Sequence, residues 1–234
     1  MRIALIGDIH GNLVALEAVM DDIDRRGADA IVCLGDVAAT GPQPVETIER
    51  VAGLGCPVVM GNTDEWLLDP ADEAIEDDDT RRIVEIDLWV HEQLGHRHRE
   101  LLRGYRPLVE LDGLLGYHGS PRSNTEVLLP TTPDSELTAM LAGHDQPLMA
   151  GGHTHIAMLR RHGRTLVINP GSVGMPFEHV GDSFRNPPWA EYAIADDDVV
   201  EFRRVPVDVG AITGAALASG MPNAGWWVKD WSWT

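Results

Sequence analysis

The stretch MRIALIGDIHGN, residues 1–12, shows the pattern from which the fold of this chain can be predicted. Its apolar run, RIALIG, ends in a glycine and is followed by two polar side chains, Asp8 and His10. Apolar residues then recur at the spacing of a helix face, at positions 13, 16, 20 and 23. The stretch therefore predicts a buried strand, a polar turn and a helix.

The same order recurs in the first third of the chain. ADAIVCLG (28–35) has the pattern of a second buried strand, residues 43–53 that of a second helix, and CPVVMG (56–61) that of a third strand. This β-α-β-α-β order is typical of parallel strands with helices packed outside them. The sequence therefore predicts an α/β fold.

Further helices and strands are predicted downstream. Residues 80–104 have the pattern of a long helix, and LVEL and LLGYHG predict a hairpin that turns at Asp112-Gly113. The other predicted elements are a helix over 133–143, a strand at PLMAGG (147–152), two strands within 156–168, and strands near 190–195 and 199–205.

Residues of the kinds that bind metals follow five of the predicted strands. They are Asp8 and His10, Asp36, Asn62, His118, and the pair His153 and His155. In open α/β sheets, sites gather at the carboxyl ends of the strands, so we expect these side chains at one rim. One histidine pair alone would be weak evidence, whereas five equivalent positions together favour a shared site.

The chemistry of this set indicates a class of metal. Two carboxylates, one amide oxygen and four imidazoles, without a thiolate, suit divalent Mn, Fe, Zn, Co or Ni. Seven ligands exceed the needs of one ion and fit two ions that share a carboxylate, about 3.5–4 Å apart. Two dications would leave a net positive charge that attracts an anionic phosphate.

Composition limits the partners. The 234 residues include 37 acidic and 18 basic side chains, and the net charge of −19 repels nucleic acid and anionic lipid. The chain has no run of about 18 apolar residues, and its N-terminal apolar stretch is too short for a signal peptide. We expect a cytoplasmic protein without membrane or stable nucleic-acid partners, and self-association is left open.

Two segments have an unusual composition. Seven of the eleven residues in 69–79 are acidic, which fits a solvated loop or helix start, or a charged screen near a site entrance. The C-terminal GWWVKDWSWT holds four of the seven tryptophans. We expect this tail to pack on its own domain or to close a dimer. The alternative is that it lies over the mouth of the site.

Six short motifs follow one another in the chain. They are GDIHGN (7–12), GD (35–36), GNTD (61–64), HGS (118–120), GGHTH (151–155) and NPGS (169–172). In order and spacing they resemble the calcineurin-like metallophosphoesterase superfamily, and within it the small bacterial and archaeal phosphodiesterase-like branch. The resemblance implies a four-layer αββα sandwich formed by one domain, residues 1–234, with a helical insertion near 64–105 and the tryptophan-rich tail near 210–234.

The resemblance also implies a ligand set and a reaction. One metal would be held by Asp8, His10, Asp36 and His155, and the other by Asp36, Asn62, His118 and His153. The implied cofactors are two divalent ions, Mn, Fe or Zn before Co or Ni. The implied reaction is hydrolysis of a small phosphate ester, a diester before others, by direct attack of a metal-bridging hydroxide.

Substrate contacts are expected from residues beside these motifs. Asn12 resembles a residue that positions a ligand or phosphate, and it fits the cap of the first helix equally well. Ser120 and Ser172 follow glycines near the predicted site, where either could donate a hydrogen bond to phosphate.

One position departs from the family pattern. Many members read Gly-Asn-His followed by an acidic residue, and that histidine is thought to protonate the leaving group, whereas this chain has Thr63. A threonine hydroxyl has far too high a pKa for a general acid, and losing such an acid typically costs about 10²–10⁴-fold in rate. The catalytic candidates are Asp36, Asn62, Thr63 and Asp64, and the role of Asp64 is left open.

Two alternative functions are kept. The chain could be a non-catalytic scaffold that retains the fold and binds partners. It could also be a phosphomonoesterase, a protein phosphatase or a dinucleotide polyphosphatase, although the acidic surface and the missing histidine argue against these. Because all seven ligand positions are filled, we favour hydrolysis of phosphodiesters.

Overall fold

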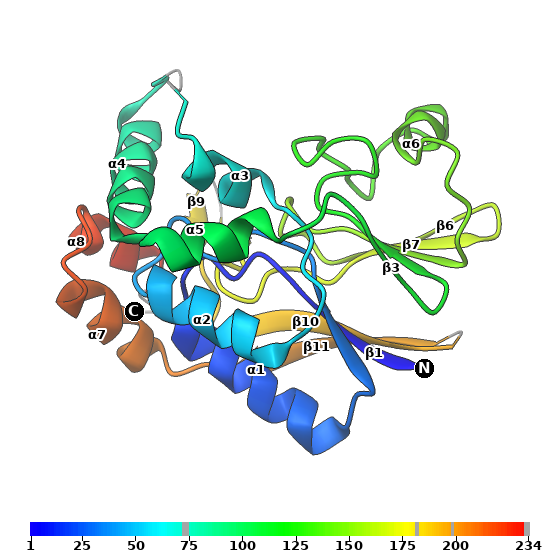
Figure 1. Cartoon of the computed structure of the whole chain (residues 1–234), viewed down its shortest axis with the longest axis horizontal. Helices are drawn as coiled ribbons and strands as arrows, with labels where there is room; N and C mark the ends of the chain where they lie inside the picture. Colours follow the sequence, from blue (N-terminus) through cyan, green and yellow to red (C-terminus); the bar gives the residue numbers. More distant parts are fainter. Residues whose placement is uncertain (72–74, 181–182, 198, 232–234) are drawn as a thin grey trace.

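Two β-sheets form the centre of the computed structural model, which describes residues 1–71, 75–180, 183–197 and 199–231. Figure 1 shows both sheets from the side. The first sheet has the order β11-β10-β1-β2 and consists of β1 (Arg2–Ile6), β2 (Ala30–Cys33), β10 (Trp189–Asp196) and β11 (Val199–Pro206). The second has the order β3-β4-β5-β7-β6 and consists of β3 (Val109–Leu111), β4 (Leu114–Gly116), β5 (Leu148–Ala150), β6 (Met158–His162) and β7 (Thr165–Asn169).

Strand β1 shows why the sheets stack as they do. Successive side chains of a strand point to opposite faces. Ile3 and Leu5 lie in the apolar core between the two sheets, whereas Ala4 and Ile6 lie in the core on the helix side. Because both faces of β1 are covered by apolar side chains, its residues after Arg2 form an unbroken apolar run in the sequence.

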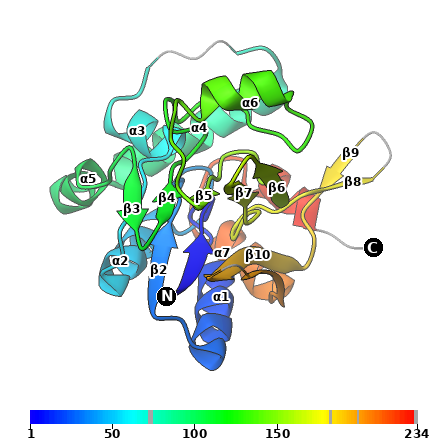
Figure 2. The same cartoon turned by 90° about the vertical axis from the view of Figure 1, so that its right-hand side faces the viewer.

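Helices cover the outer faces of both sheets. Helices α1 (Leu13–Arg26), α2 (Pro44–Leu54) and α7 (Val209–Ala218) bury apolar side chains over the first sheet. Helix α6 (Asp134–Met140) packs Leu137 and Met140 against the second sheet. Figure 2 shows these helices on opposite sides of the two sheets. The predicted α/β, four-layer αββα fold class is therefore confirmed.

The prediction of a third strand over residues 56–61 is wrong, because these residues do not form a strand of normal length. Only Val58 and Val59 pair, through isolated parallel bridges to Cys33 on one side and Arg106 on the other. Pro57 limits the pairing because it has no backbone N–H to donate. The chain nevertheless runs parallel to β2, so Asn62 still reaches the end of the sheet that carries Asp36.

The helical region also differs from the prediction. The helix predicted over 80–104 is two helices, α4 (Asp78–Gln93) and α5 (His96–Arg103), because Gly95 caps the start of α5. Helix α3 (Asn62–Leu68) was predicted only as part of a helical insertion near 64–105, and the hairpin of β8 (Glu178–Val180) and β9 (Ser183–Arg185) was not predicted. Within the acidic stretch, Asp77 caps α4, which agrees with a helix start; residues 72–74 lie outside the described part.

The tryptophan-rich tail packs on its own chain. It forms α8 (Ala224–Trp227) and the 3₁₀ helix η1 (Val228–Trp231), and residues 232–234 lie outside the described part. Trp227 and Trp231 are only 4% and 1% exposed and belong to the core that covers the first sheet. These two side chains are therefore part of the fold.

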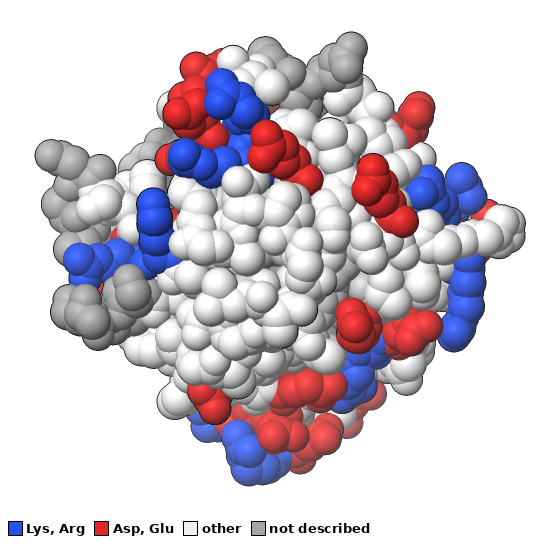
Figure 3. All heavy atoms as spheres, turned by 90° about the vertical axis from the view of Figure 1, so that its left-hand side faces the viewer, with Lys and Arg blue, Asp and Glu red and all other residues white. Residues whose placement is uncertain are grey.

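Charge is unevenly distributed over the surface. Figure 3 shows the side that carries α4, α7 and α8, where charged side chains surround a broad uncharged area. Residues 209–228, which include α7 and α8, contain no Asp, Glu, Lys or Arg. Self-association through any face stays a prediction. Among the described residues, no helix is both long and apolar enough to cross a lipid bilayer.

Asp22 joins α1 to the first sheet. Its carboxylate accepts hydrogen bonds from the Tyr192 hydroxyl of β10 at 2.8 Å and from Arg25 and Arg26 at 3.1 Å, and Arg203 of β11 lies 3.4 Å away. Burial opposes the charged form, but the hydrogen bonds from Tyr192, Arg25 and Arg26 outweigh it. The pKa of Asp22 is therefore lowered.

Asp22→Asn is expected to lower the free energy of unfolding by about 1–3 kcal/mol near neutral pH, because charged hydrogen bonds are lost. A lowered folded-state pKa stabilises the protein above the unfolded value of about 3.9, and this effect disappears as the pH falls through the folded value. Urea unfolding should show that the stability lost in Asp22→Asn is smaller below pH 4 than at pH 7. The exposed Asp21→Asn is the control. An equal loss at both pH values would contradict this account.

Candidate metal centre

The seven predicted ligand residues meet at one edge of the two sheets. Asp8 and His10 follow β1, Asp36 follows β2, Asn62 begins α3, His118 follows β4, and His153 and His155 follow β5. Two groups within this set could each hold a metal ion, and the ligand atoms of each group lie within 4.8 Å of one another: Asp8, His10 and His155, and Asp36, His118 and His153.

Asp36 lies between the two groups. Its Oδ2 atom is 3.8 Å from His10 Nε2 in the first group and 3.3 Å from His118 Nε2 in the second. Asn62 Oδ1 lies 3.0 Å from His118 Nε2, so the amide also faces the second group. One carboxylate is therefore placed where two cations could share it.

Backbone carbonyls orient three of the four imidazoles. The Nδ1 atoms of His10, His118 and His155 lie 3.1, 2.7 and 2.8 Å from the carbonyl oxygens of Ala39, Leu34 and Met175. A carbonyl can only accept, so in these three rings Nδ1 carries a proton and Nε2 faces the centre. This is the usual arrangement of metal-binding histidines.

The backbone at these residues adopts an unusual conformation. Asp8, His10, Asp36, His153 and His155 all have positive φ, between 48° and 68°. The left-handed region costs a non-glycine residue on the order of 1 kcal/mol or more. Five such residues in one site indicate that this backbone conformation is kept despite its cost, because it sets the direction in which these side chains point.

Two glycines make room for the carboxylates. A Cβ atom at Gly61 would lie 2.1 Å from Asp36 Oδ1, and one at Gly152 would lie 2.7 Å from Asp8 Oδ2. Asp8 Oδ2 is buried and accepts no hydrogen bond from any described residue. A buried carboxylate oxygen without a donor is costly, and a cation would remove that cost.

The electrostatics of the cluster favour a positive charge at its centre. Burial raises the pKa of Asp8 to about 6 and lowers the pKa values of His10, His153 and His155. Burial also acts against a charged His118, but Asp36 and Asp8 outweigh it and raise its pKa to about 10. Burial likewise opposes a charged Asp36, but His118, His10 and Thr63 outweigh it and hold its pKa well below the usual range.

Asp64 has a structural role that the sequence left open. It is fully buried, and its carboxylate accepts hydrogen bonds from the backbone N–H groups of Asp36, Val37 and Gly61 at 2.8, 2.9 and 3.1 Å. Burial and the nearby charge of Asp36 raise its pKa to about 7. Asp64 therefore joins the turn after β2 to the start of α3, which fixes Asp36 and Asn62 relative to each other.

The predicted substrate contacts are engaged within the protein. Asn12 caps α1 by accepting from the Ala15 N–H and also donates to the Gly174 carbonyl, which agrees with its capping role. The Ser172 hydroxyl is buried and donates to the Asp8 carbonyl, so it holds the turn after β1. The Ser120 hydroxyl donates to Glu126 at 2.6 Å. A role of Asn12 or Ser120 in substrate binding stays a prediction.

Thr63 lies beside Asp36. Its backbone N–H donates to Asp36 Oδ1 at 3.0 Å, which leaves Asp36 Oδ2 facing the histidines. The Thr63 hydroxyl is buried and has no hydrogen-bond partner among the described residues. The backbone of Thr63 therefore orients the shared carboxylate.

A network that the sequence analysis missed supports His10. The Ala39 carbonyl that orients His10 is followed by Thr40, whose own carbonyl accepts from Trp227 Nε1 at 2.7 Å. The Thr40 hydroxyl donates to Asp87 of α4 at 3.0 Å. Long-range contacts of this kind have no local sequence signal, although the concentration of tryptophan in the tail marks it as a packing element.

Comparison with known proteins identifies the family. A family model described as the calcineurin-like phosphoesterase superfamily domain matches residues 1–194. An uncharacterised protein of Methanocaldococcus jannaschii is 30% identical over 229 residues, 88% of each chain. The phosphodiesterase YfcE of Escherichia coli is 26% identical over 212 residues, 86% of this chain and 90% of that one. This chain belongs to the calcineurin-like phosphoesterase superfamily.

A solved structure supports the same assignment. The crystal structure of a metallophosphoesterase from Sphaerobacter thermophilus matches with a TM-score of 0.79 at 28% identity, over 99% of this chain and 98% of the other. The resemblance derived from the sequence motifs is confirmed. Membership of this metal-dependent family supports a phosphoesterase hydrolase, and the two residue groups at the sheet edge are its candidate metal sites.

Trp227→Phe should weaken divalent-metal binding by about tenfold, the lower end of the range for residues that orient a ligand. The substitution keeps an aromatic ring but removes the N–H that holds Thr40 and, through it, the carbonyl facing His10. Competition with a chromogenic chelator would measure the affinity. The control is Trp226→Phe, since Trp226 instead stacks on Arg82 at 5.7 Å. Equal effects of the two substitutions would contradict this role.

Proposed function

We propose that this protein hydrolyses small phosphodiesters with the help of two divalent metal ions. The observation that carries the proposal is the position of Asp36, whose Oδ2 atom faces a histidine of each candidate metal group. A shared carboxylate of this kind is the arrangement expected of a two-metal site.

The donor set fits the proposed ions. Asp8, His10, Asp36 and His155 would hold one ion, and Asp36, Asn62, His118 and His153 the other. Imidazole and carboxylate ligands without thiolate favour Mn, Fe or Zn, and they also accept Co or Ni. The buried Asp8 Oδ2 without a donor and the inward Nε2 lone pairs are the features that such cations would satisfy.

The chain's own groups would prepare the site for reaction. When bound, two such ions lower the pKa of water and offset charge on phosphoryl oxygens. The backbone carbonyls fix three of the histidine rings, Asp64 fixes the turn that carries Asp36, and the Thr63 N–H sets the orientation of the shared carboxylate. Little reorganisation would then be needed when substrate arrives, and such preorganisation is a major source of catalysis.

The preference for diesters follows from the leaving group. At the position where many family members have histidine, Thr63 cannot supply a proton near neutral pH, which disfavours monoesters with poor leaving groups. The relative from Escherichia coli is named a phosphodiesterase, and its 86% coverage of this chain supports the same class of substrate here.

The direct test compares a diester with its monoester. Bis(p-nitrophenyl) phosphate should be hydrolysed faster than p-nitrophenyl phosphate by metal-free protein reloaded in turn with Mn, Fe, Co, Ni and Zn. Release of p-nitrophenol reports both reactions. Faster turnover of the monoester would contradict the diester preference, and absence of turnover with all five metals would overturn the hydrolase proposal.

Thr63→His should raise turnover of an alkyl phosphomonoester about tenfold or more relative to that of bis(p-nitrophenyl) phosphate, because the leaving alkoxide needs a proton and p-nitrophenolate does not. Thr63→Ser is the control, since it keeps a hydroxyl and the backbone N–H that orients Asp36. Metal content is measured alongside activity for each variant. If a fully loaded Thr63→His enzyme keeps the wild-type ratio, the missing acid does not explain the substrate preference.

A further inference from the structure

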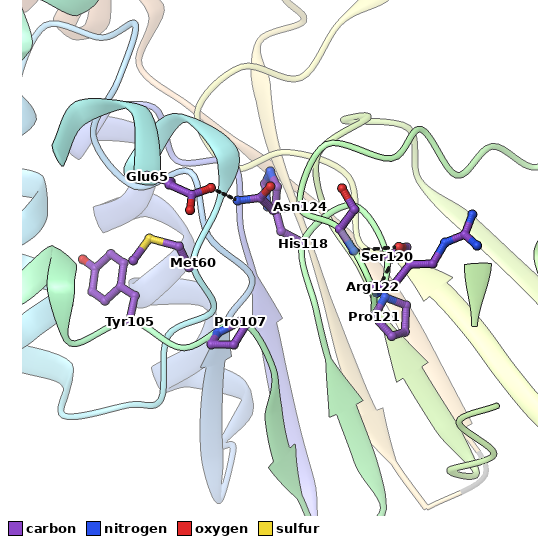
Figure 4. A pocket seen from close by; sticks show the side chains of 10 residues that line it. Met60, Glu65, Tyr105, Pro107, His118, Ser120, Pro121, Arg122 and Asn124 are labelled. Carbon is purple, nitrogen blue, oxygen red and sulfur yellow. Dashed lines mark hydrogen bonds between the residues drawn. The ribbon is translucent and has the colours of Figure 1, made fainter. Parts of the chain in front are cut away.

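A cavity of about 480 Å³ opens beside His118. We call it the arm pocket, and its walls include Met60, Glu65, Tyr105, Pro107, Pro121 and Asn124. Figure 4 shows His118 between two walls, with Met60 and Tyr105 on one side and Pro121 on the other. Because His118 both lines the pocket and faces Asp36, a group esterified to a phosphate at the centre would extend into it.

The walls of the arm pocket are suited to a flat ring. Met60, Tyr105, Pro107 and Pro121 present a thioether, an aromatic ring and two prolines, all apolar surfaces. The volume lies within the range of about 300–1,000 Å³ typical of small-molecule pockets and exceeds the needs of a methyl group. The pocket therefore favours an organic group of appreciable size.

The charges of the arm pocket disfavour a second phosphate. Arg122 is the only lysine or arginine among the described residues that line it, and its guanidinium is bound to Glu126 at 2.5, 2.9 and 3.0 Å. Apart from His118 at the metal centre, Glu65 then leaves the lining of the pocket with a net negative charge. A polyphosphate group attached to the reacting phosphate would be repelled there. The pocket therefore favours an uncharged group.

Glu65 gives the arm pocket an acceptor. Asn124 Nδ2 donates to Glu65 Oε2 at 2.9 Å, which joins α3 to the loop after β4 across the pocket (Figure 4). This bond uses one carboxylate oxygen and steadies the side chain, so the other oxygen can accept from a ligand. An N–H donor on the edge of a ring that lies between the apolar walls would satisfy it.

We propose that the arm pocket binds the base of a nucleoside phosphodiester, with the ring between the apolar walls and an N–H group donating to Glu65. The inference rests on the proposed phosphodiesterase function. Glu65 and Tyr105 would then determine specificity by binding the base, and not by acting on the reacting phosphate.

The test uses two diesters that differ only in the base, the p-nitrophenyl esters of adenosine 5′-phosphate and of ribose 5-phosphate, because p-nitrophenolate leaves without a proton. Hydrolysis is followed by ³¹P NMR with the metal that supports the fastest turnover. The adenosine ester should have a KM at least about tenfold lower, with a similar kcat, because binding of a remote group lowers KM. Glu65→Ala and Tyr105→Leu should each reduce this advantage to about threefold or less and leave the ribose ester unchanged.

The controls separate the two proposals. Glu110→Ala removes an exposed carboxylate of β3 outside the pocket and should keep the adenosine preference. Glu65 is exposed, so its replacement does not endanger folding, and Tyr105→Leu retains apolar volume. Equal KM values for the two esters would overturn the base-binding proposal and leave the phosphodiesterase proposal standing. The same would follow if the Glu65 and Tyr105 variants lost activity equally toward both esters. Absence of hydrolysis of both esters would count against the phosphodiesterase function itself.

Discussion

The carboxylates of Asp8 and Asp36 are buried together with imidazole nitrogens that face them, and the surrounding turns and helices must hold these groups close to one another. His10 Nε2 and His155 Nε2 lie 3.1 Å apart, and the carbonyls beyond each ring place both protons on Nδ1. Two lone pairs at this distance repel each other unless a positive charge lies between them. The left-handed backbone at five ligand residues adds to the cost. Binding of cations would offset both.

The two sheets are joined through this site as well as through their shared core. The His153 N–H donates to Asp8 Oδ1 at 3.0 Å, and His118 Nδ1 lies 2.7 Å from the Leu34 carbonyl, so each contact links one sheet to the other. The turns after β1 and β2 are also paired, since Asp8 and Gly11 donate to the carbonyls of Gly35 and Val37. The fold thus holds the site rigid from several directions.

The tryptophan-rich tail and the helical region extend this support outward. Trp227 and Asp87 approach Thr40 from the tail and from α4, and Thr40 follows the residue whose carbonyl orients His10. Asp64 performs the corresponding task beside Asp36. Parts of the chain that supply no metal ligand therefore set the geometry of the ligand residues. The site depends on the tail and on α4 as well as on the strands that carry the ligands.

Sequence patterns predicted the strands and turns whose form is set by neighbouring residues. Apolar runs that end in glycine located β1, β2, β4 and β5, and the residues after them converge as the carboxyl-end rule requires. The hairpin at Asp112-Gly113 was predicted because both residues suit positive φ, which they adopt. The break before Gly95 was missed although its signal is local, and the role of Asp64 and the contact between Trp227 and Thr40 were missed because distant partners set them. Their partners lie 28 to 187 residues away in two of these cases, beyond the reach of periodicity.

The number of divalent ions that the protein binds shows whether two ions share Asp36. Metal-free protein titrated with Mn²⁺ or Zn²⁺ in a calorimeter, with elemental analysis of the dialysed product, gives this number. The account predicts about two ions per chain for the wild type and one at most for Asp36→Asn, since that substitution removes the shared carboxylate. A wild-type chain that binds one ion or none, or an Asp36→Asn chain that binds two as tightly, would contradict it.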